Sequence, residues 1–195
     1  MSKIVVFLSV TLDGVMQGPG HPDEDRRGGF DRGGWAAPYA DAMTMGMASE
    51  GAGTTDALLF GRHTYEQFYT VWHGRTDNPF SPILDNSRKY VASRTLSEPL
   101  PWANSVLLKG EAAETVGALR AGPGNDIVIL GSGELVRSLL ARDLVDRMIL
   151  LIHPLVLGGG QRLFAATNPV LSWRLADSRV STTGVVIATY ERAED

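Results

Sequence analysis

Two segments of this sequence combine residue types that bind anions, and each directly follows a short apolar run. In the first, the run Ile127–Leu130 stops at Gly131-Ser132-Gly133, and Leu135, Val136, Leu139 and Leu140 then recur at helical spacing. Unpaired N–H groups and the positive end of the helix dipole meet at a helix start, and glycines let a ligand approach the backbone closely. We therefore expect a phosphate group at this junction.

The second segment repeats this order of strand, sharp turn and helix. The run Ala57–Phe60 leads into Gly61-Arg62-His63-Thr64, and Thr64 with Gln67 predicts a capping box that starts a helix at Thr64. Two such junctions in one parallel sheet indicate two contacts to a ligand that carries more than one phosphate.

Other interpretations of these residues stay open. A glycine between a strand and a helix also serves as a turn alone, and Arg62 also fits a solvated surface position. The first junction is not a Rossmann fingerprint, because Val136 stands where the third small residue belongs, and no GxxxxGK[ST] loop occurs. Gly131-Ser132-Gly133 does not match the GxSxG elbow of hydrolases, and Ser132 or Ser9 as a nucleophile has no base at suitable spacing.

Composition limits the classes of partner and compartment. The chain has 195 residues, 44% of them hydrophobic, so we expect one domain over 1–195. The net charge of −4 argues against nucleic acid, and the absence of Cys excludes disulfides and fits a cytoplasmic protein. The histidines show no metal-ligand spacing, so no metal is expected, and the apolar run after Lys3 is too short for a signal peptide or a membrane span.

The remaining elements follow from periodicity and turn residues. A polar loop is expected over Gln17–Gly34, where a long stretch with almost no apolar residue except Phe30 indicates a lid, and His73–Asn86 should be a polar connection. The unit after Asp126 reads β-α-β, which predicts a parallel sheet. We expect strands at Lys3–Val10, Lys89–Ala92, Ser105–Leu108 and Met148–Leu157, helices at Ala37–Ala48 and Glu111–Arg120, and a closing antiparallel hairpin at Trp173–Val180 and Val185–Glu191.

Four motifs in order resemble the dihydrofolate reductase-like family, and in particular its branch formed by the C-terminal reductase domain of riboflavin biosynthesis proteins. They lie at 9–14 (SVTLDG), 59–66 (LFGRHTYE), 89–95 (KYVASRT) and 129–135 (ILGSGEL), so the resemblance covers nearly the whole chain. It implies an α/β, three-layer fold with a mixed, mostly parallel central sheet, flanking helices and a C-terminal antiparallel hairpin, as a stand-alone member.

The resemblance also implies NADPH as the cofactor, bound in an extended pose. The pyrophosphate would lie between the two helix starts, and the adenosine 2′-phosphate near the third motif. The turn after the first strand would lie close to the nicotinamide. The implied cofactor-binding residues are Leu12, Asp13, Gly14, Gly61, Arg62, His63, Thr64, Ser93, Arg94, Gly131, Ser132, Gly133, Glu134 and Leu135.

The expected catalytic residue is Asp41. Dihydrofolate reductase proper keeps a carboxylate in the helix after the lid, and Asp41 is the nearest candidate, although the segment between Trp35 and Gly61 is longer here. The basic and acidic motif that reads a ribose phosphate in the riboflavin-pathway enzymes is absent.

We therefore expect an NADPH-dependent oxidoreductase of a small heterocycle, similar to 5-amino-6-(5-phosphoribosylamino)uracil reductase of riboflavin biosynthesis. The alternatives are a dihydrofolate or pterin reductase, and a non-catalytic nucleotide-binding module that uses the same two phosphate contacts. The expected partners are the small-molecule substrate and a second copy of the chain in a homodimer, with neither nucleic acid nor membrane.

Overall fold

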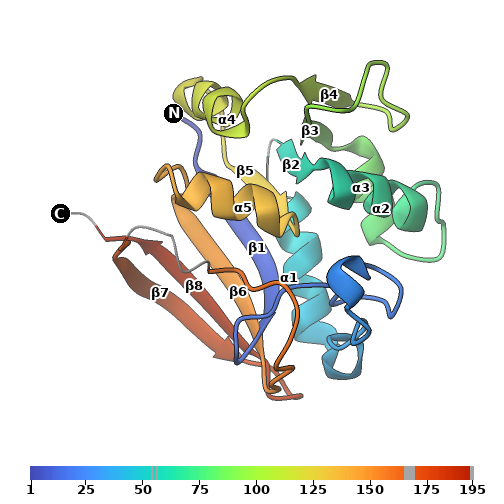
Figure 1. Ribbon diagram of the computed structural model, residues 1–195, viewed down its shortest axis with the longest axis vertical. Coiled ribbons are helices and arrows are strands. Elements are labelled where there is room, and N and C mark those ends of the chain that lie inside the picture. Colours follow the sequence, from blue (N-terminus) through green and yellow to red (C-terminus); the bar gives the residue numbers. More distant parts are fainter. Residues whose placement is uncertain (54, 56, 165–169, 194–195) are drawn as a thin grey trace.

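The fold was analysed in a computed structural model, which describes residues 1–53, 55, 57–164 and 170–193. Its centre is an eight-stranded sheet in the order β4-β3-β2-β5-β1-β6-β8-β7 (Figure 1). The strands are β1 (Ile4–Thr11), β2 (Ala57–Gly61), β3 (Arg88–Ala92), β4 (Ser105–Leu108), β5 (Ile127–Leu130), β6 (Arg147–His153), β7 (Trp173–Val180) and β8 (Val186–Arg192).

The first six strands are parallel, and β7 and β8 form an antiparallel hairpin beside β6. This is the mixed, mostly parallel sheet that the sequence predicts. The apolar runs in β2 and β5 are buried over Ala57–Phe60 and Ile127–Leu130, as expected for central strands covered on both faces.

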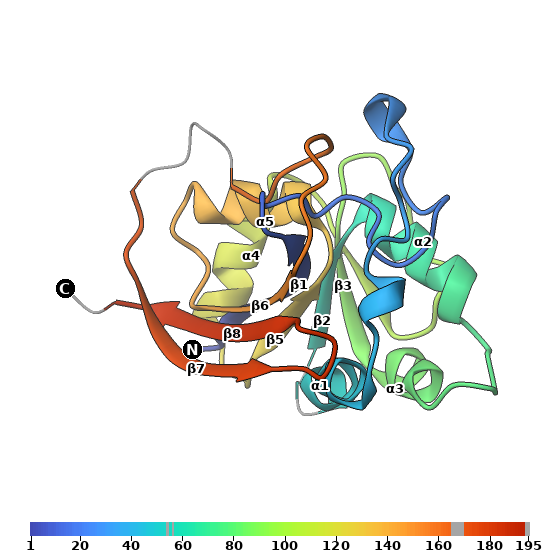
Figure 2. The same ribbon diagram turned by 90° about the horizontal axis from the view of Figure 1, so that it is seen from below.

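Helices cover both faces of the sheet, which gives three layers. Figure 2 shows α4 (Ala112–Ala121) and α5 (Gly133–Leu140) on one face, with α1 (Ala42–Gly53) and α3 (Phe80–Asn86) on the other. Helix α2 (Arg62–Trp72) shares the second face, because its Tyr65 joins the same core cluster as Leu84 of α3. Two short 3-10 helices, η1 (Arg27–Gly29) and η2 (Ala37–Tyr39), lie between β1 and α1.

The expected helix over Ala37–Ala48 is two elements rather than one. Pro38 lies inside η2, and the chain becomes extended at Ala40 before Asp41 starts α1. Asp41 Oδ1 accepts the N–H of Thr44 (2.8 Å), and Thr44 Oγ1 accepts the N–H of Asp41 (3.0 Å). This reciprocal pair is an N-terminal cap, so it fixes where α1 begins.

Two further predictions about elements are wrong. The expected polar connection over His73–Asn86 contains α3, whose last carbonyls accept hydrogen bonds from the buried ammonium of Lys89, including Leu84 O at 2.7 Å. Helix α2 starts at Arg62 rather than Thr64, and no side chain caps it. The expected capping box does not form, because Thr64 Oγ1 accepts a hydrogen bond from another segment, the N–H of Ser132.

Candidate cofactor and substrate site

The residues singled out in the sequence gather at one edge of the sheet. Parallel strands end at the same edge, and β3, β2, β5 and β1 are consecutive neighbours in the sheet. Each of the four motifs covers the carboxyl end of one of these strands and the turn after it. A crevice at the carboxyl ends of parallel strands is the usual place for a ligand in an open α/β sheet.

The starts of α2 and α5 are joined directly by side-chain hydrogen bonds. The N–H of Gly61 donates to Ser132 Oγ (2.9 Å), and the N–H of Ser132 donates to Thr64 Oγ1 (3.0 Å). Ser132 adopts a left-handed conformation (φ 59°, ψ 47°) that non-glycine residues rarely take, and this conformation turns the chain into α5. The two helix starts are therefore one connected unit.

The glycines at this unit lie against side chains of neighbouring segments. Gly131 has a φ of 61°, which favours glycine, and an added Cβ would meet Thr64 Cγ2 at 3.1 Å. A Cβ on Gly133 would overlap the thioether of Met16. Met16 belongs to the loop after β1, and its buried side chain packs against Gly133. Neither α2 nor α5 has a side-chain cap, so their first N–H groups stay free of the capping acceptors that many helices use.

The charged and polar residues beside these turns have different environments. Arg62 and His63 are exposed, and Arg62 forms an ion pair with Glu66 one turn along α2 (3.1 Å). Arg94 is 79% exposed, and its nearest carboxylate partner is Glu111 at 4.0 Å. The guanidinium of Arg94 is therefore available to a ligand at the end of β3.

Ser93 has a local role in the turn after β3. Its hydroxyl is buried and accepts the N–H groups of Thr95 and Leu96 (both 3.1 Å). The hydrogen bonds of this side chain shape the turn that presents Arg94.

The turn after β1 is organised by a carboxylate. Asp13 accepts hydrogen bonds from the hydroxyl of Thr11 (2.6 Å) and from the N–H groups of Leu157 and Gly158 (3.1 and 2.9 Å). These donors, the Thr11 hydroxyl above all, lower the pKa of Asp13 from 3.8 to about 2. Asp13 thereby joins the β1 turn to the loop after β6, with Leu12 exposed beside it and Gly14 at a φ of 78°.

The remaining two residues of the α5 start face opposite ways. Leu135 is buried in the core. Glu134 is exposed and forms an ion pair (2.9 Å) with Arg27 of the loop over 17–34, which the sequence predicts to be a lid and which is called the lid loop below. The loop therefore contacts the helix start that is expected to hold phosphate.

The carboxylate of Asp41 is fully engaged in structural contacts. Besides capping α1, its Oδ2 accepts both the N–H and the hydroxyl of Thr182 in the β7–β8 turn (2.9 and 2.7 Å). These contacts, led by the N–H of Thr44, lower the pKa of Asp41 to about 2. The structure gives Asp41 a role in joining α1 to the hairpin, and its catalytic role stays a prediction.

The lid loop is held by a residue that the sequence reasoning did not single out. Gln17 is 4% exposed, and its amide donates to Arg27 O (2.9 Å) and accepts the N–H of Gln161 (3.0 Å). Its backbone carbonyl accepts the indole N–H of Trp35 (2.7 Å). A buried glutamine in a polar loop carries no pattern in sequence that predicts these three contacts.

His153 is the second residue missed. It ends β6 at the same edge, is 3% exposed, and has no hydrogen-bond partner for either ring nitrogen among the described residues. The available signal was a single histidine inside the apolar run Met148–Leu157, whereas the spacing between histidines bears only on metal binding.

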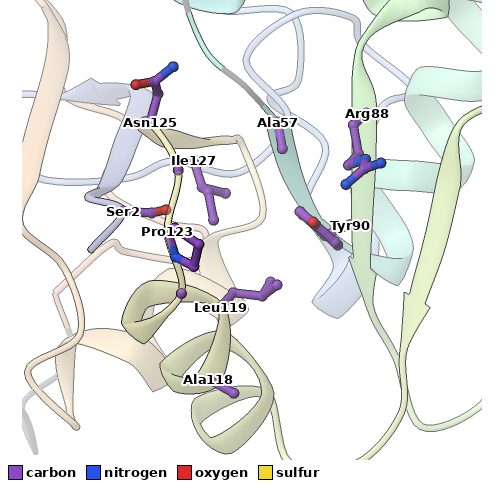
Figure 3. Close-up of a pocket in the computed structure, with 11 residues that line it drawn as sticks. Ser2, Ala57, Arg88, Tyr90, Ala118, Leu119, Pro123, Asn125 and Ile127 are labelled. Atoms are coloured by element: carbon purple, nitrogen blue, oxygen red, sulfur yellow. The ribbon is translucent and has the colours of Figure 1, made fainter.

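Two hollows in the surface lie at opposite edges of the sheet. One, of about 430 Å³, lies between the lid loop and the loop after β6, and Arg27, Arg32 and Gly160 are among its lining residues. The other, of about 360 Å³, lies at the amino ends of the strands, with Arg88 and Tyr90 of β3 on one wall and Leu119 of α4 on another (Figure 3). Only the first lies at the edge where the candidate residues gather.

The described residues contain no group of three or more His, Asp or Glu side chains arranged to hold a metal ion. Across the same residues, no helix has the length and apolar character needed to cross a membrane.

Known proteins resemble this chain in sequence and in fold. The uncharacterized protein YyaP of Bacillus subtilis (strain 168) is 28% identical, with 96% of this chain and 94% of YyaP covered. The uncharacterized protein YwjB of the same organism is 29% identical, with coverage of 83% and 82%.

Two solved structures have a similar fold. A protein of Shewanella sp. PV-4 provisionally assigned to riboflavin biosynthesis superimposes with a TM-score of 0.73 at 25% identity, covering 98% of this chain and 99% of that one. A pyrimidine reductase-like protein of Corynebacterium diphtheriae gives 0.68 at 16% identity, covering 100% and 93%. The sequence model of the family described as RibD C-terminal domain matches residues 2–187. The chain belongs to the RibD C-terminal domain family.

Proposed function

We propose that this protein is an NADPH-dependent reductase of a small planar heterocycle, with a ribosylaminouracil of the riboflavin type as the first candidate substrate. The observation that carries the proposal is the joined pair of helix starts, where Ser132 connects α2 and α5 at the carboxyl edge of the sheet. Membership of the RibD C-terminal domain family supports it.

The residues at this edge fit a dinucleotide. Two uncapped helix starts suit the two phosphates of a pyrophosphate. In this proposal His63, Thr64, Glu134 and Leu135 contribute backbone at these starts. The exposed guanidinium of Arg94 suits a further phosphate at the end of β3.

The remaining residues would position the reacting rings. NADPH, when bound, supplies a hydride for an electron-poor carbon of the substrate. The turn at Leu12, Asp13 and Gly14 would lie beside the nicotinamide, and the hydrogen bonds of Asp13 to the loop after β6 hold that turn rigidly. The protein's contribution is orientation and exclusion of water.

A nucleotide-binding module without turnover is the second candidate. It is favoured by one observation: both oxygens of Asp41, the expected catalytic carboxylate, are used in structural hydrogen bonds. Such a module would bind NADPH equally well and leave heterocycles unreduced.

A two-stage experiment separates these functions. NADPH is first titrated into the protein with cofactor fluorescence and thermal unfolding as readouts, since a ligand that binds only the folded state raises the melting temperature. Ribosylaminouracils and pterins are then screened for loss of the nicotinamide absorbance. Absence of NADPH binding would reject both functions, and binding without turnover of any compound would favour the module.

We further propose that residues 1–195 form a single domain. Two copies of the chain would associate as a homodimer, and the protein would act in the cytoplasm. Analytical ultracentrifugation of the purified chain tests the dimer directly, and a monomer at micromolar concentration would contradict it.

A further inference from the structure

His153 lies where a ligand at the carboxyl edge would meet the sheet. It is the last residue of β6 and pairs in register with Thr11, the last residue of β1. Side chains alternate along a strand, so His153 faces the same side as Leu151, which packs with Met47 of α1. The imidazole is therefore on the α1 side of the sheet, beside the turn proposed to hold the nicotinamide.

The imidazole is buried without a hydrogen bond. It is 3% exposed, and neither Nδ1 nor Nε2 has a partner among the described residues. The hydroxyl of Thr11 on the neighbouring strand already donates to Asp13, and the indole N–H of Trp35 already donates to Gln17 O. A buried polar group in this state is destabilising, so it needs an explanation outside the packing of the core.

Two aromatic side chains cover the imidazole, and both come from the segment after the lid loop. The Trp35 ring lies edge-on at a centroid distance of 5.1 Å and 87°, and the Tyr39 ring lies at 5.6 Å and 77°. Tyr39 is held through its carbonyl by the hydroxyl of Thr183 (2.6 Å). Displacement of Trp35 with the lid loop would open the imidazole to the edge of the sheet while Tyr39 stays in place.

We propose that His153 is a substrate-contacting residue, whose imidazole hydrogen-bonds a polar atom on the ring of the heterocycle when the Trp35 segment moves aside. This inference rests on the proposed function. Phosphate is a poor match for the position, because His153 has no helix start or second cation beside it in the contacts described above.

The protonation state of the imidazole agrees with this role. Burial lowers the pKa of His153 from 6.5 to about 4, so the ring is neutral near pH 7. A neutral imidazole has one donor and one acceptor nitrogen. It can therefore pair with a ring carbonyl or with a ring N–H, which are the groups on the edge of a uracil or a pterin.

The test compares His153→Phe with wild type, using NADPH and 5-amino-6-(ribosylamino)uracil 5′-phosphate as the probe. Phenylalanine keeps an aromatic ring at this position and removes both unpartnered nitrogens, so we expect an unchanged or higher melting temperature and NADPH affinity within about twofold of wild type. We expect KM for the probe to rise at least about tenfold, which corresponds to the loss of about 1.4 kcal/mol. His153→Gln, which restores a donor and an acceptor, should recover part of the loss.

Leu151→Met is the matched control, because Leu151 is buried on the same face of the same strand. A nearly volume-conserving change there tests whether small packing changes alone alter the kinetics. We expect its KM to stay within about twofold of wild type. An equal rise in KM for Leu151→Met and His153→Phe would overturn the inference, and so would a His153→Phe enzyme with wild-type kinetics.

Failure of the inference can be told from failure of the proposed function. If wild type reduces the probe and His153→Phe does so equally well, only the inference fails. If wild type neither binds NADPH nor binds the probe, the proposed function fails and the inference falls with it. Should His153→Phe not fold, or should wild type bind NADPH without reducing the probe, the ring nitrogen NMR signals of His153 in the wild-type NADP⁺ complex decide. A shift on adding the probe supports the contact, and unchanged signals reject it.

Discussion

Gly133 is the residue at which the proposed phosphate contact can be tested most directly. A valine here would crowd the start of α5, so we expect Gly133→Val to weaken NADPH binding at least about tenfold, which corresponds to the loss of one charge-assisted hydrogen bond. The valine would also displace the thioether of Met16. Isothermal titration of NADPH gives the affinity, and circular dichroism checks the fold.

The double variant Met16→Ala/Gly133→Val separates the two effects of the valine. If the valine itself blocks the start of α5, binding stays weak in the double variant, because the valine is still present there. Recovery of binding would show that the displaced Met16 caused the loss. Gly46→Ala is a control, since an added Cβ at Gly46 in α1 meets no atom within 4 Å.

Arg94 should carry most of the discrimination between NADPH and NADH. Its ion pair with Glu111 is long, at 4.0 Å, whereas Arg62 is already paired with Glu66 at 3.1 Å. One charge-assisted hydrogen bond contributes about 1.5–3 kcal/mol, or roughly ten- to a hundredfold in affinity. We expect Arg94→Ala to reduce the NADPH preference by at least about tenfold with NADH affinity nearly unchanged, and Arg62→Ala to have a smaller effect.

Paired titrations of the two cofactors measure this preference for each variant. Arg179→Ala, at an exposed ion pair with Asp177 on β7, controls for loss of a positive charge. Equal weakening of both cofactors by Arg94→Ala would place this arginine at the shared pyrophosphate instead.

Among the elements, the lid loop depends on the buried amide of Gln17. Gln17→Ala would leave the N–H of Gln161 and the carbonyl of Arg27 without these partners, at a cost of about 1–3 kcal/mol to the closed loop. We expect trypsin to cleave at Arg26 or Arg27 at least about fivefold faster than in wild type, because cleavage follows the population of the open loop.

NADPH together with a substrate should slow this cleavage in wild type, as expected for a lid that closes over its ligands. Asp31→Ala, which removes a carboxylate that is 88% exposed in the same loop, should have a smaller effect. Wild-type cleavage rates in Gln17→Ala would show that its hydrogen bonds do not hold the loop.

The sequence predicted the strands better than the helix starts, for physical reasons. Apolar runs such as Ile127–Leu130 have few alternatives to a buried strand, and the structure places this one as expected. The short helix α3 contains Pro82, and the carbonyl groups at its end are bound by Lys89 of the next strand. Lys89 lies outside residues 73–86, so the hydrophobic periodicity of that segment could not predict this contact. The start of α2 was misplaced because Thr64 bonds to Ser132 rather than to its own helix.

In the candidate site, too, some features could be predicted from the sequence and others could not. Its glycines and the anion-binding character of its two junctions were predictable, because both follow from local residue order. The contacts of Met16, Gln17 and His153 were not, because each depends on which distant segment lies against the residue.

At the scale of the whole molecule, Asp13 links stability to pH. Hydrogen bonds lower its pKa in the folded state from 3.8 to about 2, so the ionised form stabilises the fold above about pH 4. This contribution is lost as the pH falls through about 2. We expect Asp13→Asn to lower the free energy of unfolding at pH 7, and the difference from wild type to shrink between about pH 4 and pH 2.

Urea unfolding at a series of pH values measures this difference. Asp31→Asn is the control, because the side chain of Asp31 is 88% exposed in the same region. A difference between wild type and Asp13→Asn that stays constant down to pH 2 would show that the carboxylate contributes by shape rather than by charge.

The hydrogen bonds between Gly61, Thr64 and Ser132 also determine when the site can form during folding. They join residues 68 and 71 positions apart in the chain, so they require β2 and β5 to have paired. Contacts between distant segments form only after the entropy of closing the intervening loop has been overcome. A partly folded chain would therefore lack the cofactor site, even where both helices have formed. In stopped-flow refolding, NADPH binding should return together with the native tryptophan fluorescence, and binding that precedes it would show that one helix start suffices.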